Sequence, residues 1–387
     1  MNRPYQHLPW YQPPVAYADQ HATRSSYSAR VDRADGRLRR LLATAPAIGI
    51  HDHPFLLPAN LDAENWGNWR REKRLEYAYE AMASSGVTAA VASTNSWHTA
   101  AEIETMLPRF LADLAHHDGF HLVSRFADLT AGIAPDGGLP TSVGVILGLE
   151  SMTEFGHDLD AVERLFGLGV RVGGLIYSDG NLLGGGLSSA FDEGLTSQGR
   201  AVLRRMNEVG MVADFAHAGD RTTLDAIEAS TVPIMISHAG SRSLWPTSRM
   251  KPDDLIKALA DTGGIIGVEA PPNSTCVPGQ EGHTIDHVMA HVERIVELVG
   301  VDAVALGLDV TFGPHHQLHM IRAAAPHGDV RPVDGLPRAT YVDGLENPEE
   351  GFWNAGWWLI EHGYADEDIR KILGGNALRY FKTVMPG

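Results

Sequence analysis

The sequence is poor in cysteine, since its 387 residues contain Cys276 and no other. A single cysteine excludes an internal disulfide, and we expect it to be structural, because no pattern around it indicates an activated thiol. Long apolar runs are absent too: none reaches the roughly 18 residues that span a bilayer. The first residues lack the charged start and apolar run of a signal peptide. We therefore expect a soluble cytoplasmic protein with no membrane partner.

Basic residues are outnumbered, because 31 Lys and Arg face 48 Asp and Glu and the formal net charge is -17. Such a charge repels a phosphate backbone, so we expect no nucleic-acid partner. With 44% hydrophobic and 20% charged residues, the composition is that of a globular protein large enough to bury a sizeable core. The expected partner is a small-molecule substrate.

The chain divides into a polar N-terminal arm, residues 1–44, and one large domain, residues 45–387. The arm has no regular period, and we expect it to lie extended on the main body. From Ile48 onward, short apolar runs alternate with longer amphipathic segments, which is typical of repeated βα units. The eight expected strands are 48–53, 87–94, 143–150, 170–177, 211–217, 232–238, 264–270 and 302–309. They predict a closed (β/α)8 barrel of the TIM type. A ninth run, 121–127, is either an accessory strand or a helix end.

The segments between the strands have recognisable helix limits. One helix is expected to begin after Pro252, and two others to end at Gly210 and Gly300, because proline starts and glycine stops helices. Residues 311–350 are rich in His, Pro, Gly and Asp without a period, and they predict a long loop after the last barrel strand, a lid or binding loop. The last expected helices, which close the barrel with an aromatic cluster, are 352–363, 366–375 and 376–384.

Polar residues gather where the expected strands end. Barrel enzymes place their reacting groups at these carboxyl ends. Four histidines and two carboxylates stand there on five different strands, too many to be unrelated structural residues. They are His51, His53, Glu150, His217, His238 and Asp309. The pattern predicts a metal centre.

The spacing of these residues suggests how metal ions would be shared. Residues two apart on a strand point to the same side, so His51 and His53 are expected to bind one cation at the barrel mouth. His217 and His238 can hold a second cation, with Glu150 bridging the two. This arrangement is that of two-metal hydrolases, whose ions lie roughly 3.5–4 Å apart. Nitrogen and carboxylate ligands favour zinc.

Two zinc ions would share a water of lowered pKa and polarise the scissile carbonyl. Asp309 is then placed to accept the water's proton and pass it to the leaving amine. The sequence therefore predicts a zinc-dependent hydrolase with Asp309 as its general acid/base.

In chain order, these residues stand in His-x-His, GLE, DFAH, ISHAGSR and GLD, followed by the ending IRKILGGNALRYF. This series resembles the membrane (renal-type) dipeptidases over about residues 48–381. The resemblance implies a binuclear zinc dipeptidase with the same ligands, and it implies a homodimer. It also implies that Arg249 binds the carboxylate of the substrate's C-terminal residue, which suits a guanidinium fork.

Two positions depart from the family's pattern. His53 stands where the family has Asp, which keeps a ligand but removes one negative charge from the cluster. Tyr177 stands where family dipeptidases have a histidine that polarises the substrate carbonyl. A tyrosine hydroxyl donates one hydrogen bond but cannot become cationic, so Tyr177 is a candidate catalytic and substrate-binding residue for an altered substrate.

The leading prediction is hydrolysis of a dipeptide or a similar small amide with a free carboxylate. One alternative keeps the metals but acts on a specialised non-peptide amide or a lactam, as His53, Tyr177 and the long loop suggest. Another alternative is a catalytically silent binding protein on the same barrel, against which the full set of ligand candidates counts.

Other motifs are set aside. His287 and His291 lie four apart on an expected helix but lack the zinc-protease pattern His-Glu-x-x-His, and we expect both to face solvent. The glycine clusters have no strand-to-helix context for a dinucleotide, and a P-loop is absent. No nucleotide cofactor is indicated.

Overall fold

The structure, a computed structural model, describes residues 26–56, 78–94, 99–134, 138–156, 158–312, 339, 341–346 and 348–387. The strands in these ranges are β1 Ile48–Leu56, β2 Ala89–Thr94, β3 Phe120–Leu122, β4 Val143–Leu149, β5 Val170–Gly174, β6 Val212–Asp214, β7 Met235–Ala239, β8 Ile265–Val268, β9 Val304–Leu306 and β10 Thr311–Phe312. They form one sheet in the order β10-β1-β2-β4-β5-β6-β7-β8-β9, with β3 paired to β4. All of these pairings are parallel.

The sheet closes into a barrel because its last strands return to its first. β9 pairs with β8, and β10, which follows β9 in the chain, pairs with β1. Beside this pairing, the backbone N–H of Asp309 donates to the His51 carbonyl, 3.1 Å away. The eight expected runs supply β1, β2 and β4 through β9, so the predicted (β/α)8 barrel is confirmed. The ninth run forms β3, an accessory strand along β4.

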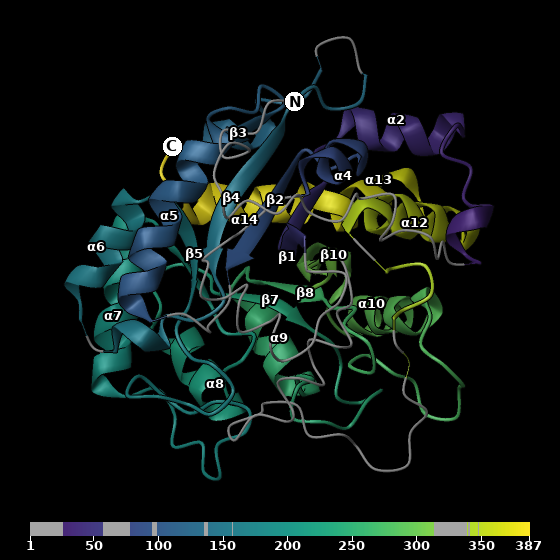
Figure 1. The fold of residues 1–387 in the computed structure, drawn as a ribbon. Coiled ribbons are helices and arrows are strands. Elements are labelled where there is room, and N and C mark those ends of the chain that lie inside the picture. Colours follow the sequence, from purple (N-terminus) through teal and green to yellow (C-terminus); the bar gives the residue numbers. More distant parts are fainter. Residues whose placement is uncertain are drawn as a thin grey trace.

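Helices surround these strands (Figure 1). They are α2 Gly36–Thr44, α4 Tyr79–Ser84, α5 Ala100–Leu114, α6 Asp160–Gly167, α7 Ser197–Val209, α8 Asp220–Ala229, α9 Asp253–Asp261, α10 Ile285–Val299, α12 Pro348–Glu361, α13 Asp366–Arg370 and α14 Asn376–Val384. As predicted, α9 begins after Pro252, and α7 and α10 end at Gly210 and Gly300. These two glycines have φ of 78° and 82°, a region that side chains with a Cβ avoid.

A separate apolar cluster fills the inside of the barrel. Each of the eight barrel strands contributes to it, from Ile50 on β1 to Ala305 on β9, and α14 adds Tyr380 and Phe381. The Tyr380 hydroxyl donates to the Pro233 carbonyl just before β7, 3.0 Å away. Because the contributing residues lie in the first or middle part of each strand, α14 covers the N-terminal end of the barrel. The C-terminal end is left for polar side chains.

The end of the N-terminal arm is a helix, so the expectation of an extended arm is wrong for α2. Asp35 caps this helix by accepting the backbone N–H groups of Arg37 and Leu38. Leu38, Leu41 and Leu42 follow helical spacing and are buried, and in Figure 1 α2 lies beside α12 and α13. The burial of one leucine face explains why this segment folds onto the domain.

The long loop predicted at 311–350 falls mostly outside the described residues. Its start is the short strand β10, and α12 begins at Pro348, before the predicted helix start. The lid remains a prediction. No helix in the part of the chain that the structure describes is long and apolar enough to cross a membrane.

Candidate metal centre

Strand β1 supplies the first two histidines of the site. Ile50 faces the barrel interior, and plain alternation would then turn His51 to the outside. A register shift in the pairing of β1 with β2 intervenes between Gly49 and Asp52. Such a shift, as in a β-bulge, re-aims the side chains that follow it. His51 and His53 therefore both reach the mouth of the barrel.

The other candidate ligands come from four further strands. Glu150 follows β4 by one residue, and His238 lies within β7. His217 and Asp309 stand in the turns after β6 and β9. Asp309 has φ 55°, a left-handed conformation that Asp adopts more readily than most residues. All four side chains thus lie at the carboxyl ends of the strands, as the sequence predicts.

A first group of side chains meets around Asp309. Its Oδ1 atom lies 3.0 Å from His53 Nε2 and 3.6 Å from His51 Nε2. The rings of His51 and His53 are perpendicular, with centroids 5.0 Å apart. Glu150 Oε2 lies 4.0 Å from His53 Nε2, so one oxygen of this glutamate also lies close to the first group.

A second group meets around the other oxygen of Glu150. Glu150 Oε1 lies 3.0 Å from His217 Nε2 and 3.7 Å from His238 Nε2. The two imidazole nitrogens are themselves 3.0 Å apart. Glu150 therefore stands between the two groups, with one oxygen toward each, as a bridging ligand would.

The chemistry of both groups fits metal ions. His51 Nε2 is buried and has no hydrogen-bond partner among the described residues. A buried polar atom in that state costs free energy unless something binds it. In each group the ligand atoms lie within 4.8 Å of one another, and imidazole nitrogens with carboxylate oxygens are donors that divalent metals such as zinc accept. The barrel mouth thus holds a buried cluster of candidate metal ligands.

The far ring nitrogen of two of these histidines is held by a serine. His53 Nδ1 lies 2.9 Å from the Ser93 carbonyl oxygen at the end of β2. His217 Nδ1 lies 3.0 Å from Ser178 Oγ. Hydrogen bonds of this kind fix the ring orientation and leave Nε2 for a metal.

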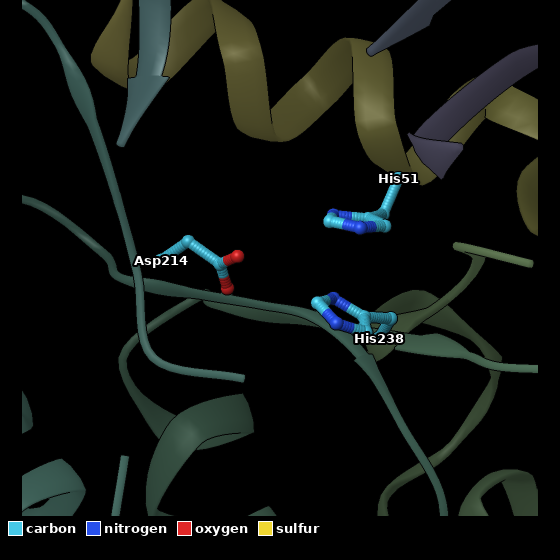
Figure 2. Close-up of side chains that lie close together, drawn as sticks. All are labelled: His51, Asp214 and His238. Atoms are coloured by element: carbon cyan, nitrogen blue, oxygen red, sulfur yellow. The ribbon is translucent and has the colours of Figure 1, made fainter. Parts of the chain in front are cut away.

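The other two histidines share one serine. Ser237 Oγ lies 2.7 Å from His238 Nδ1 and 3.3 Å from His51 Nδ1, and the two rings stack with centroids 3.6 Å apart. Figure 2 shows that the Asp214 carboxylate faces the same two rings. Asp214 and the serines were not predicted as site residues from the sequence. A signal exists for two of them, since Asp214 and Ser237 are polar residues inside otherwise apolar strands.

The charges of the site hold two of its carboxylates, those of Asp309 and Glu150, in the ionised form. Burial alone would raise the pKa of Asp309, but His238 and the hydrogen bond from His53 hold that pKa well below its usual range. For Glu150, the nearby imidazoles of His217 and His238 likewise overcome burial and lower the pKa. Burial, with Arg249 nearby, lowers the pKa of His217 to about 3. Asp309 and Glu150 are thereby negatively charged and His217 is neutral, the states that bind cations. For His53, burial is overcome by the hydrogen bond with Asp309, which raises the pKa of this imidazole to about 9.

Arg249, the predicted carboxylate-binding residue, lies beside the metal ligands. Its Nη1 atom donates to the Ala216 carbonyl (2.9 Å) and its Nη2 atom to the His238 carbonyl (2.7 Å). Nη2 also makes a short ion pair with Glu269, which is fully buried and follows β8 directly. Burial raises the pKa of Glu269 to about 7 although Arg249 opposes this. Glu269 was not singled out in the sequence.

Tyr177 also lies at the site. Its ring stacks on that of His217, with centroids 4.3 Å apart and an interplanar angle of 21°. The residue after it, Ser178, is the one that contacts His217 Nδ1. The loop after β5 therefore covers one ligand of the second group with an aromatic ring.

The expectation that His287 and His291 face solvent is wrong, because both are buried. His291 Nδ1 accepts the Ser241 backbone N–H at 2.9 Å, and His287 Nδ1 accepts that of Thr284 at 3.1 Å. Neither belongs to a group of candidate metal ligands in the described residues. Their role is structural, since they satisfy backbone donors of the loops that precede and follow α9.

The chain matches the model of one protein family over most of its length. A family model described as membrane dipeptidase, peptidase family M19, matches residues 36–318, well over half of the chain. The chain belongs to the membrane dipeptidase family. The match includes every candidate ligand from His51 to Asp309, and it confirms the resemblance seen in the sequence.

Individual relatives carry dipeptidase names. Dipeptidase tcpJ of Claviceps purpurea is 28% identical over 244 residues, which are 62% of this chain and 50% of that protein. Dipeptidase aclJ of Aspergillus oryzae is 26% identical over 249 residues, 63% of this chain and 52% of that protein. The chain thus spans about half the length of these curated relatives.

Solved structures of two other proteins share the fold. An amidohydrolase from Pseudomonas aeruginosa aligns with a TM-score of 0.72 and 24% identity over 90% of this chain and 98% of that one. A metallopeptidase from Rhodobacter sphaeroides, solved with a phosphinate mimic of the dipeptide L-Ala-D-Ala, aligns with a TM-score of 0.67 and 17% identity over 88% and 99%. At these identities the likeness concerns the barrel architecture.

Proposed function

We propose that this member of the membrane dipeptidase family is a zinc-dependent hydrolase that cleaves a dipeptide or a similar small amide with a free carboxylate. The observation that carries the proposal is the convergence of two groups of buried ligands on the two oxygens of Glu150. In this proposal His51 and His53 would hold one zinc ion, His217 and His238 would hold the other, and Glu150 would contribute to both sites.

The roles of the side chains follow from their chemistry. When bound, two zinc ions supply a water of lowered pKa and polarise the scissile carbonyl. Asp309, ionised and close to both histidines of β1, takes a proton from the attacking water and returns it to the leaving amine. Tyr177, whose ring covers His217, donates a hydrogen bond from its hydroxyl to the substrate carbonyl.

The free carboxylate of the substrate is assigned to Arg249. A guanidinium fork suits a carboxylate, and this one lies against the carbonyl of His238. Glu269 already pairs with the same fork. A substrate carboxylate must therefore compete with a buried glutamate, which weakens binding compared with an unpaired arginine.

The Arg249–Glu269 pair favours a second candidate function on the same ligands. If Glu269 stays on Arg249, the site excludes a second carboxylate by charge repulsion and by the cost of burying it. The substrate would then be a specialised amide or a lactam that has no free carboxylate or whose carboxylate does not bind Arg249. His53, which removes one negative charge from the usual ligand set, and Tyr177 point the same way.

A panel of substrates separates these functions. Amine release from unblocked L,L and L,D dipeptides is measured with the zinc-loaded protein and with a metal-stripped sample. Metal-dependent dipeptide cleavage supports the first proposal. Turnover of neutral amides or lactams without dipeptide cleavage supports the second. Bound zinc without any turnover would leave a binding protein and overturn both.

A further inference from the structure

We infer that the Ser237 hydroxyl, oriented by Asp214, couples the two metal-binding groups, because it holds one imidazole of each. This inference rests on the proposed two-metal centre. His51 belongs to the first group and His238 to the second, and Ser237 Oγ is within hydrogen-bond distance of Nδ1 of both. Ser237 and Asp214 are positioning residues that act on the metals through these rings.

The hydrogen bonds around the hydroxyl use its full capacity. A serine hydroxyl has one hydrogen to donate and two lone pairs to accept. The hydrogen goes to Asp214 Oδ2 at 2.5 Å, because a carboxylate only accepts. The lone pairs remain for N–H groups on Nδ1 of His238 at 2.7 Å and of His51 at 3.3 Å. Both rings thereby carry their proton on Nδ1 and present Nε2 as a lone pair to a metal.

Asp214 is itself fixed in orientation. Its Oδ1 atom accepts the backbone N–H of Ser237 at 2.9 Å and that of Ala216 at 3.1 Å. Only Oδ2 then faces the hydroxyl. The side chains of Asp214 and Ser237 are buried, so water does not compete strongly for these bonds. One carboxylate on β6 thus sets the direction of a hydroxyl on β7, which in turn sets two histidines on β1 and β7.

The same geometry argues against a third cation between Asp214 and the two rings. Their ligand atoms lie within 4.8 Å of one another, as they would around an ion, and Figure 2 shows the carboxylate facing the ring edges. Ser237 Oγ, however, already stands among the three, between 2.5 and 3.3 Å from each. The hydroxyl occupies the place that a cation with bonds of roughly 2.0–2.2 Å would need.

Ser178 offers a matched control. Its hydroxyl also contacts the Nδ1 atom of a candidate ligand, His217, at 3.0 Å. Among the described residues, the hydroxyl of Ser178 contacts that one imidazole, which belongs to the second group. A serine that supports one ligand should affect one metal ion, whereas a serine that supports a ligand in each group should affect both.

The test is zinc titration of the full, metal-stripped chain by calorimetry. The unmodified protein is expected to bind two ions. Ser178→Ala should weaken one binding step, and Ser237→Ala should weaken both, each by about 10- to 100-fold, the usual loss when such a support is removed. If Ser237→Ala weakens one step or neither while the protein stays folded, the coupling is refuted. If the unmodified protein binds fewer than two ions, the two-metal centre fails instead.

A second readout needs no metal at all. Nitrogen-15 NMR of the metal-free protein reports which ring nitrogen of each histidine carries the proton. His51 and His238 are expected in the Nδ1–H form, and Asp214→Asn should disturb both, because an amide N–H then competes for the Ser237 lone pairs. This variant keeps the side-chain shape, so it serves if Ser237→Ala does not fold. Unchanged tautomers in Asp214→Asn would overturn the inference.

Discussion

The histidines of this chain use their two ring nitrogens in opposite ways. In the candidate metal centre, Nδ1 of His53 and of His217 is held by Ser93 or Ser178, and Nε2 faces the neighbouring candidate ligands. On α10, His291 accepts a backbone N–H on Nδ1, and its Nε2 faces the Cys276 carbonyl at 3.3 Å. A neutral ring with its proton on Nε2 and its lone pair engaged has nothing left for a metal. Ring-nitrogen use therefore separates the two kinds of histidine.

Asp309 is suited to a test of its role as proton carrier. Its φ of 55° is one that Asn also adopts readily, so Asp309→Asn should fold. The amide cannot take up the proton of the attacking water, and we expect kcat to fall by about 100-fold or more. Metal content, measured by elemental analysis, should stay near that of the unmodified protein. An unchanged kcat would remove Asp309 from the mechanism.

Glu269→Gln tests how the substrate carboxylate is recognised. The change removes the negative charge that pairs with Arg249 but keeps the size of the side chain. For a dipeptide substrate we expect KM to fall several-fold, because the guanidinium becomes available, while kcat changes less. Arg249→Lys is the companion variant, and it should raise KM because it loses the fork. A higher KM in Glu269→Gln would mean that the pair itself forms the binding site.

Single residues differ in how far the sequence could reveal them. The six ligand candidates were predictable, because each is a polar residue at the end of an apolar run. Glu269, which also ends such a run, became visible as a functional residue once Arg249 was seen beside it. Asp214 and Ser237 meet across two strands, and sequence spacing does not show which residues of neighbouring strands stand side by side.

At the scale of elements, the barrel strands were predicted better than their register and than helix α2. Apolar runs mark buried parallel strands, so all eight barrel strands were found. The register shift in β1 was not predicted, because the sequence of one strand does not show where its pairing with the next strand becomes irregular. Helix α2 was not predicted because its three buried leucines stand among three arginines and one threonine. Only the packing against α12 and α13 shows which face of the helix is buried.

Helix α14 closes the N-terminal end of the barrel, and Phe381 is its test. This side chain is fully buried among the barrel residues. Phe381→Ala should lower the free energy of unfolding by about 3–5 kcal/mol, the usual cost of such a cavity. The neighbouring exposed Lys382→Ala is the control and should change it by less than about 0.5 kcal/mol. Equal denaturation midpoints for the two variants would contradict the placement of α14.

For the whole molecule, the buried histidines near α10 predict a dependence of stability on pH. Burial lowers the pKa of His283 from 6.5 to about 3 and that of His291 to about 4. Below pH 6.5 the unfolded chain takes up protons that the folded chain refuses, so the free energy of unfolding falls as the pH falls toward 4. Two such groups contribute about 2.7 kcal/mol per pH unit.

The measurement is urea denaturation of metal-stripped protein between pH 7 and pH 4.5. The double variant His283→Gln, His291→Gln should show a shallower slope of stability against pH than the unmodified chain, even if it is less stable throughout. Comparing slopes cancels the contribution of the other histidines. Identical slopes would show that these two rings do not resist protonation.

The closure of the barrel through β10 and β1 also sets an order of events during synthesis. His51 and His53 leave the ribosome early, but Asp309, which completes their group, follows more than 250 residues later. Until that segment arrives and docks on β1, the nascent chain holds a pair of imidazoles without its carboxylate. Loading of the proposed metal centre would therefore be a late step, and a chain cut just before β10 would carry all six candidate ligands yet lack the strand that docks on β1.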